Sequence, residues 1–226
     1  MNGIDAIAKK YNLPVIKVPI EYVYLINNNS NNNNNDKKEN KYEVSEVEKN
    51  KIKEMIKESE TNSTKEDIIT QMKWKLISYI SKEEEGVDKV MLGTNASRTA
   101  ANLVSFTCKG RGFALPNYLS TSYSLNDVTF IYPMRDFLAK EVGIYNHLHK
   151  IIPVNVITLH TKTNTKWSID HLSQHFIESL QVEFYHTVHT LLKSSSKLYT
   201  PSSSIQIHCS LCSKYVIFIL LYFILY

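Results

Sequence analysis

The sequence predicts an α/β protein built on an open, mostly parallel sheet with helices on its faces. Short apolar runs at residues 88–92, 128–132 and 154–159 read as buried strands, and they alternate with segments whose apolar residues recur at helical spacing. Strands that alternate with helices favour parallel pairing, because each helix carries the chain back to the same end of the sheet. The chain has 226 residues, of which 43% are hydrophobic, so it is long enough to bury one core.

The first 62 residues predict a partial α/β element followed by an insertion. Residues 4–11 carry apolar side chains at helical spacing, and residues 15–20 read as a short strand, so residues 1–26 form the partial element. Residues 27–62 are a low-complexity and charged insertion. Residues 27–35 are almost pure Asn and cannot bury enough apolar surface to offset chain entropy, which predicts a disordered surface loop. Residues 43–57 carry weak apolar periodicity and favour a solvated helix.

Residues 63–193 form the main predicted α/β domain. Thr64 or Asp67 can cap a helix over residues 63–80, and Gly110 and Gly112 end a helix over residues 96–108. Asp136 is expected to cap a helix over residues 137–149, and a long amphipathic helix is expected over residues 169–192. Residues 194–226 are predicted to be a tail with a Cys-x-x-Cys pair and an apolar end.

Polar and basic residues gather where predicted strands enter helices, the usual place for ligands in such sheets. Short polar groups after the first strand can cap the next helix or bind an anion, and Arg98 opposes that helix's dipole, which suggests a compensating phosphate. The chain has only three arginines, and we expect them at one edge of the sheet, although an ordinary N-cap, a Gly110 C-cap and codon bias explain the same residues. The predicted tRNA- or phosphate-binding residues are Gly93, Thr94, Asn95, Ser97, Arg98, Lys109, Arg111 and Arg135.

Composition sets limits on partner, metal and compartment. The formal net charge of +4 permits RNA binding but does not by itself indicate it. Cys209 and Cys212 could share a zinc ion, yet a tetrahedral site needs four ligands, so reduced cysteines are the alternative. Residues 1–11 are too polar for the core of a signal peptide, and the apolar residues 215–226 fall short of the roughly 20 that span a bilayer. We therefore expect a cytosolic protein without a membrane segment; a tail anchor or a frame slip would also explain the apolar end.

Three long segments resemble a known family. LGTNASRTAANLVSFTCKGRGFALP, VTFIYPMRDFLAKEVGIYNHLHK and WSIDHLSQHFIESLQVEFYHTVHTLL are similar to the cytoplasmic tRNA 2-thiolation protein 2 family. The resemblance implies a fold of the PP-loop ATP-pyrophosphatase, or adenine nucleotide alpha hydrolase-like, class. It also implies a heterodimer with a paralogous catalytic subunit, which places sulfur from a thiocarboxylated ubiquitin-related modifier on the wobble uridine of tRNA as 5-methoxycarbonylmethyl-2-thiouridine.

The chain departs from that family's catalytic relatives at one turn. They carry a Gly-His-Asn-Ala-Asp-Asp-like stretch where this chain has Gly93 to Arg98, so Ser97 and Arg98 stand in the places of two acids that would bind a nucleotide's Mg²⁺. No Ser-Gly-Gly-rich loop is present, and the pattern begins and ends as though truncated at both ends. We therefore predict a non-catalytic or co-catalytic subunit with no catalytic residues and ATP at the partner. A stand-alone adenylating or sulfurtransferase enzyme and a purely structural scaffold are the alternatives.

Overall fold

The computed structural model describes residues 3–28, 42, 44–83, 87–125, 128–154, 167–198, 207–208 and 215–216. The chain divides into two compact units, one formed by Met1–Tyr79 with Lys140–Ser168 and the other by Ile80–Ala139 with Ile169–Tyr226. The predicted Asn-rich tract and most of the strand predicted at residues 154–159 lie outside the described residues.

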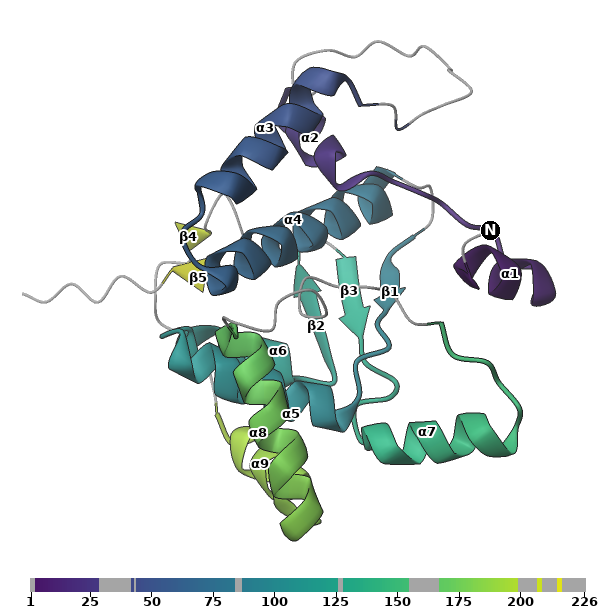
Figure 1. Cartoon of the computed structure of the whole chain (residues 1–226), viewed down its shortest axis with the longest axis vertical. Helices are drawn as coiled ribbons and strands as arrows, with labels where there is room; N and C mark the ends of the chain where they lie inside the picture. The colour runs from purple at the N-terminus through teal and green to yellow at the C-terminus, as the bar shows by residue number, and fades with distance from the viewer. Residues whose placement is uncertain are drawn as a thin grey trace, which may run out of the picture. The chain divides into compact units, whose positions relative to one another are not determined.

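The first unit is helical in its described part (Figure 1). Its elements are α1 (Gly3–Lys10), the short η1 (Ile20–Tyr22), α2 (Val23–Asn28), α3 (Glu46–Glu58), α4 (Asn62–Glu83, of which residues 62–79 belong here) and α7 (Ala139–Leu148). The helices predicted at residues 4–11, 43–57 and 63–80 are confirmed. The strand predicted at residues 15–20 is wrong, because residues 13–19 form neither a helix nor a strand and Ile20 begins η1.

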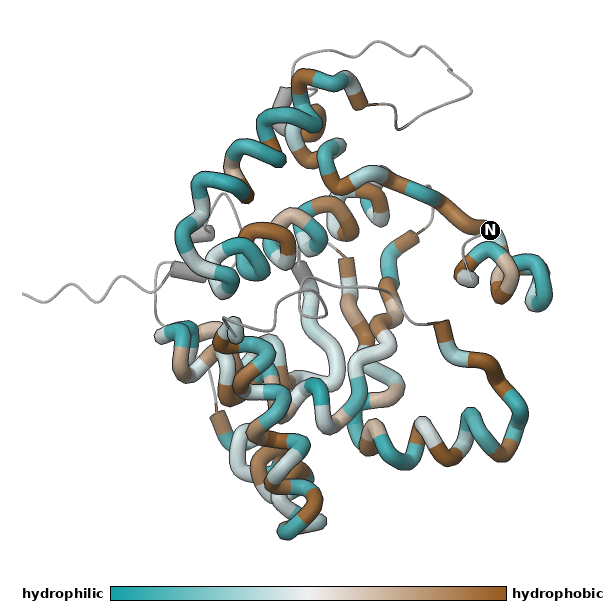
Figure 2. The backbone as a smooth tube through the Cα atoms, viewed as in Figure 1, coloured by the Kyte–Doolittle hydropathy of each residue, from teal (hydrophilic) through white to brown (hydrophobic). Residues whose placement is uncertain are grey.

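Capping in this unit differs from the prediction at two helices. The amide of Thr64 donates to the Thr61 hydroxyl at 3.1 Å, so Thr61 caps α4, and neither Thr64 nor Asp67 does. The helix predicted at residues 137–149 begins only at Ala139, so Asp136 lies outside its first turn. Helix α3 is hydrophilic along most of its length (Figure 2) and buries only Ile52, as its charged sequence predicts.

The second unit contains the sheet. Strand β1 (Lys89–Met91) pairs in parallel with β3 (Val128–Ile131), and β3 pairs antiparallel with β2 (Ser122–Leu125), in the order β1-β3-β2. The described sheet is therefore mixed, not mostly parallel, and β2 was not predicted. The central position of β3 explains why Val128 and Phe130 are buried, whereas the edge strand β1 exposes Lys89 and Met91 and is not the buried strand that its sequence suggested.

Helix α5 (Ala96–Cys108) forms the centre of this unit's core. It packs against α6 (Leu115–Leu119), α8 (Ile169–Glu183) and α9 (Thr187–Ser195), and the short η3 (Gly112–Ala114) joins α5 to α6. Ala96 and Ala100 are fully buried in one cluster with Ile177 of α8 and Leu192 of α9. Such small side chains allow neighbouring helices to approach closely.

The single helix predicted at residues 169–192 is wrong, because the chain turns between α8 and α9. A straight helix of that length would extend about 36 Å and carry its last turns away from α5. The turn instead brings Val188 and Leu192 into the core beside Ile177. A separate two-stranded pair is formed by β4 (Ile207–His208) and β5 (Tyr215–Val216).

Candidate nucleic-acid interface

The loops that leave β1 and β3 lie side by side, as the predicted parallel pairing requires. The amide of Leu92 donates to the carbonyl of Ile131 at 2.9 Å, and the amide of Ala96 donates to the carbonyl of Phe137 at 2.8 Å. The parallel register that pairs Lys89 with Thr129 carries both strands to the same edge. We call this place, formed by residues 92–98 and 132–138, the carboxyl edge.

The first turn of α5 already has protein partners at the carboxyl edge. Asn95 has an extended backbone and its side-chain oxygen accepts from the amide of Arg98 at 2.9 Å, which confirms it as the N-cap. The Ala96 amide donates a hydrogen bond to the Phe137 carbonyl. Two of the first three backbone amides of α5 therefore already donate to protein acceptors. The sequence suggested that free amides at this helix end bind an anion, but an anion here would be bound mainly by side chains.

Two small residues of the predicted site have structural placements. Gly93 is exposed, its φ lies outside the left-handed region, and a Cβ built on it would meet no atom within 4 Å. Neither a strained turn nor a close approach therefore requires glycine there. Ser97 is only 9% exposed, and its hydroxyl accepts from the amide of Ala139 at 3.2 Å, so it joins the two loops instead of facing a ligand. Thr94 is half-buried.

Arg98 is exposed at the carboxyl edge, and α8 holds its guanidinium. One terminal nitrogen, Nη1, donates to Gln174 Oε1 at 2.6 Å. Gln174 Nε2 in turn donates to Glu178 Oε1 at 2.8 Å. Sequence reasoning missed Gln174 and Glu178, because only the packing of α8 on α5 brings residues 76 positions apart together.

Arg135 lies on the neighbouring loop with little charge compensation in the described structure. Its side chain is 16% exposed, and the nearest carboxylate oxygen, on the exposed Asp136, is 4.0 Å from Nη1. The buried Nε has no hydrogen-bond partner among the described residues. The carboxyl edge therefore combines two arginines, Arg98 and Arg135, of which neither has a close ion pair in the described residues.

Lys109 and Arg111 do not belong to the carboxyl edge. They follow the last residue of α5, and from Arg98 to Cys108 the helix rises ten residues at about 1.5 Å each. The predicted constellation of three arginines on one edge is therefore wrong: Arg98 and Arg135 share an edge, and Arg111 lies at the other end of α5.

Gly110 closes α5 at the position that follows the C-cap residue, Lys109. It has a φ of +70°, its amide donates to the Thr107 carbonyl at 3.1 Å, and the Arg111 amide donates to the Phe106 carbonyl at 2.7 Å. This pair of bonds is the Schellman motif, and it accounts for Gly110 without a ligand. Arg111 is half-buried beyond it.

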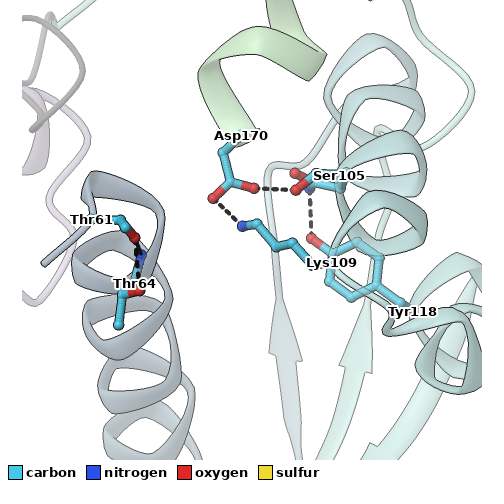
Figure 3. A network of polar contacts seen from close by, with 7 residues as sticks. Thr61, Thr64, Ser105, Lys109, Tyr118 and Asp170 are labelled. Atoms are coloured by element: carbon cyan, nitrogen blue, oxygen red, sulfur yellow. Dashed lines mark hydrogen bonds and ion pairs between the residues drawn. The ribbon is translucent and has the colours of Figure 1, made fainter. Parts of the chain in front are cut away.

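Lys109 is buried in an ion pair with α8 (Figure 3). Its side chain is 6% exposed, and Nζ lies 2.5 Å from Oδ2 of Asp170, whose other oxygen accepts from the Ser105 hydroxyl. Asp170 stands in the first turn of α8, where the helix dipole favours an acid. Lys109 therefore joins α5 to α8 and does not present its charge to RNA.

A group of tyrosines packs beside this network in the second unit. The Tyr118 hydroxyl accepts from Asn102 Nδ2 at 2.7 Å. Burial raises the pKa of Tyr118, which is labelled in Figure 3, to about 12. Burial likewise raises the pKa of both Tyr123 and Tyr132. All three hydroxyls are therefore protonated at neutral pH and are poor candidates for acid–base chemistry.

The metal prediction falls outside what the structure describes. Cys209 and Cys212 lie in the short segment between β4 and β5, which is not described. Within the described residues there is no group of three or more His, Cys, Asp or Glu side chains placed to hold a metal. Cys108 is an exposed free thiol at the end of α5.

Comparison with known proteins agrees with the resemblance seen in the sequence. A family model described as "Cytoplasmic tRNA 2-thiolation protein 2" matches residues 168–217, which include α8 and α9. The chain is 38% identical over 167 residues to the cytoplasmic tRNA 2-thiolation protein 2 of Dictyostelium discoideum, an alignment that covers 73% of this chain and 32% of that protein. It is 36% identical to the protein of the same name from Danio rerio, over 62% of this chain and 28% of that one.

The similarity to the cytoplasmic tRNA 2-thiolation protein 2 family is confirmed. The chain spans about a third of the length of these relatives. Among solved structures, the U34-tRNA thiolase NcsA from Methanococcus maripaludis with its [4Fe-4S] cluster is similar in fold, with a TM-score of 0.50 and 13% identity over 66% of this chain and 48% of that one. Across the part of the chain that is described, no helix is both long and apolar enough to cross a membrane.

Proposed function

We propose that this chain takes part in the 2-thiolation of the wobble uridine of cytoplasmic tRNA. The observation that carries the proposal is the 38% identity over 167 residues to a protein named for that process. The fold supports it, because a U34-tRNA thiolase is similar over two thirds of this chain. The proposed product is 5-methoxycarbonylmethyl-2-thiouridine, with sulfur supplied by a thiocarboxylated ubiquitin-related modifier.

The role proposed for the chain is that of a non-catalytic or co-catalytic subunit beside a paralogous catalytic partner, which binds ATP. The segment from Gly93 to Arg98 contains no acid that could bind a nucleotide's Mg²⁺. The Ser97 hydroxyl is buried against the Ala139 amide, and the Arg98 cation would repel a metal ion. A zinc ion on Cys209 and Cys212 remains part of the proposal only if further ligands complete that pair.

The proposed contact with tRNA lies at the carboxyl edge. Arg98 presents an exposed guanidinium group there, and Arg135, whose side chain is 16% exposed, adds a second one that is mostly buried. Such planar groups suit phosphate better than lysine does. Thr94 and Asn95 line the same edge and supply short polar groups. This surface would contact mainly the backbone phosphates of tRNA, and it would position the tRNA for the partner subunit.

Complementation tests the proposal. The whole chain is expressed in a strain that lacks wobble 2-thiouridine, and thiolated tRNA is measured as the retarded fraction on a mercury-containing gel. We expect the wild-type chain to restore thiolation and the Arg98→Ala/Arg135→Ala variant to lower it about tenfold or more, since each charged hydrogen bond is worth roughly 1.5–3 kcal/mol.

A matched control removes two positive charges elsewhere on the same unit. Lys193→Ala/Lys197→Ala changes exposed residues on and after α9 and should leave thiolation unchanged. Full thiolation by the double arginine variant would exclude the carboxyl edge as the tRNA site. Pyrophosphate release from ATP and tRNA by the purified chain alone would overturn the non-catalytic role.

A further inference from the structure

Two side chains of α8 each contact a basic residue on or next to α5, but only one of them neutralises the positive charge. Asp170 and Gln174 are four residues apart, so they lie on the same face of α8, and each reaches one basic side chain. Asp170 places a carboxylate on the buried Lys109 and neutralises it. Gln174 places a neutral amide oxygen on the exposed Arg98 and leaves its charge intact.

The bond from Gln174 to Glu178 fixes which atom of the amide faces Arg98. Glu178 Oε1 accepts from the amide nitrogen at 2.8 Å, so the amide oxygen points to Arg98 Nη1. This bond occupies one of the five N–H groups of the guanidinium. Glu178 therefore contacts Gln174 and not Arg98. The Arg98 cation is held in place by a hydrogen bond to a neutral amide, without a direct ion pair to Glu178.

A fixed guanidinium at the surface suits an oxyanion, and the proposed tRNA substrate offers backbone phosphates. We infer that Arg98 binds a backbone phosphate of tRNA and that Gln174, oriented by Glu178, is the positioning residue of that contact. The inference rests on the proposed function and deepens it, because it names the contacted group and two residues of α8. An acid at position 174 would pair with Arg98 directly and compete with the phosphate.

The test moves one negative charge along α8 without changing the net charge. In Gln174→Glu/Glu178→Gln the two residues are exchanged, so their mutual hydrogen bond can re-form, and the carboxylate now faces Arg98. The control, Gln181→Glu/Glu183→Gln, moves one negative charge by two residues at the end of α8 and leaves Gln174 and Glu178 unchanged. Position 181 lies about 10 Å along the helix from position 174, which is about one Debye length at 0.1 M salt.

Binding of fluorescein-labelled tRNA to the whole chain is measured by anisotropy between 50 and 200 mM salt. We expect the exchange variant to bind about tenfold more weakly, with a slope of log K against log salt that is smaller by about one, because one phosphate contact is lost. The control should bind within about threefold of wild type with an unchanged slope. Arg98→Ala added to the exchange variant should cause no further loss.

Two results overturn the inference while leaving the proposed function standing. One is equal affinity and slope for the exchange variant and the wild type. The other is an equal loss in the exchange variant and the control, which would mean that the acid acts by general repulsion. Failure of the folded wild-type chain to bind tRNA at any of these salt concentrations overturns both the inference and the proposed tRNA contact. Melting temperatures of all variants show whether each is folded.

Discussion

The ion pair between Lys109 and Asp170 gives the most direct test of how α8 is attached to α5. Asp170→Leu removes the carboxylate that faces the ammonium of Lys109, whose side chain is 6% exposed. Breaking a buried pair in this way costs about 3–5 kcal/mol, and we expect about 3 because Asp170 itself is 24% exposed. At roughly 2–4 °C per kcal/mol, the melting temperature should fall by about 10 °C.

The matched variant is Lys109→Met/Asp170→Leu, in which both charges are replaced by apolar side chains. It should lose clearly less stability than Asp170→Leu, about 1–2 kcal/mol, because no lone ammonium stays buried; the losses are the favourable acid in the first turn of α8 and the hydrogen bond from the Ser105 hydroxyl. Thermal unfolding followed by circular dichroism measures all variants. If the double variant loses as much as Asp170→Leu alone, the cost does not come from the stranded charge and the reasoning fails.

Further predictions concern the turns and the buried tyrosines. Gly110→Ala should lower stability by about 1 kcal/mol because its φ is +70°, whereas Gly93→Ala should be neutral because a Cβ meets nothing there; equal effects in urea unfolding would contradict this. Asn95→Ala should cost about 1 kcal/mol through loss of the N-cap, while Asn95→Asp should restore most of it, as judged by the same unfolding curves. Burial raises the folded pKa of Tyr118 to about 12, above the unfolded value of about 10, so the unfolded chain loses its proton first and stability should fall as pH rises from about 10 to about 12. Absorbance at 295 nm would follow this ionisation, and a Tyr118→Phe variant with an unchanged fall in stability would show that other groups cause it.

The sequence alone was enough for features that depend on neighbouring residues. Helix α5 has the predicted bounds, Asn95 caps it, and Gly110 ends it, because caps and turns are decided within a few residues. Strand β3 is buried as its apolar run predicts. The family resemblance also came from the sequence, since 36–38% identity leaves long recognisable segments.

Only the tertiary structure decided where the basic residues point and which of them keep their charge. The sequence placed Arg98, Arg111 and Arg135 at one edge of the sheet, but Arg98 and Arg111 are separated by the length of α5. The turn after Glu183, the pairing of Lys109 with Asp170, and the bond from Arg98 to Gln174 all depend on how α8 packs against α5. Contacts between residues more than 60 positions apart leave no local signal in composition or periodicity, so the sequence named Arg98 as a candidate, while the fold supplied the side chains that hold it.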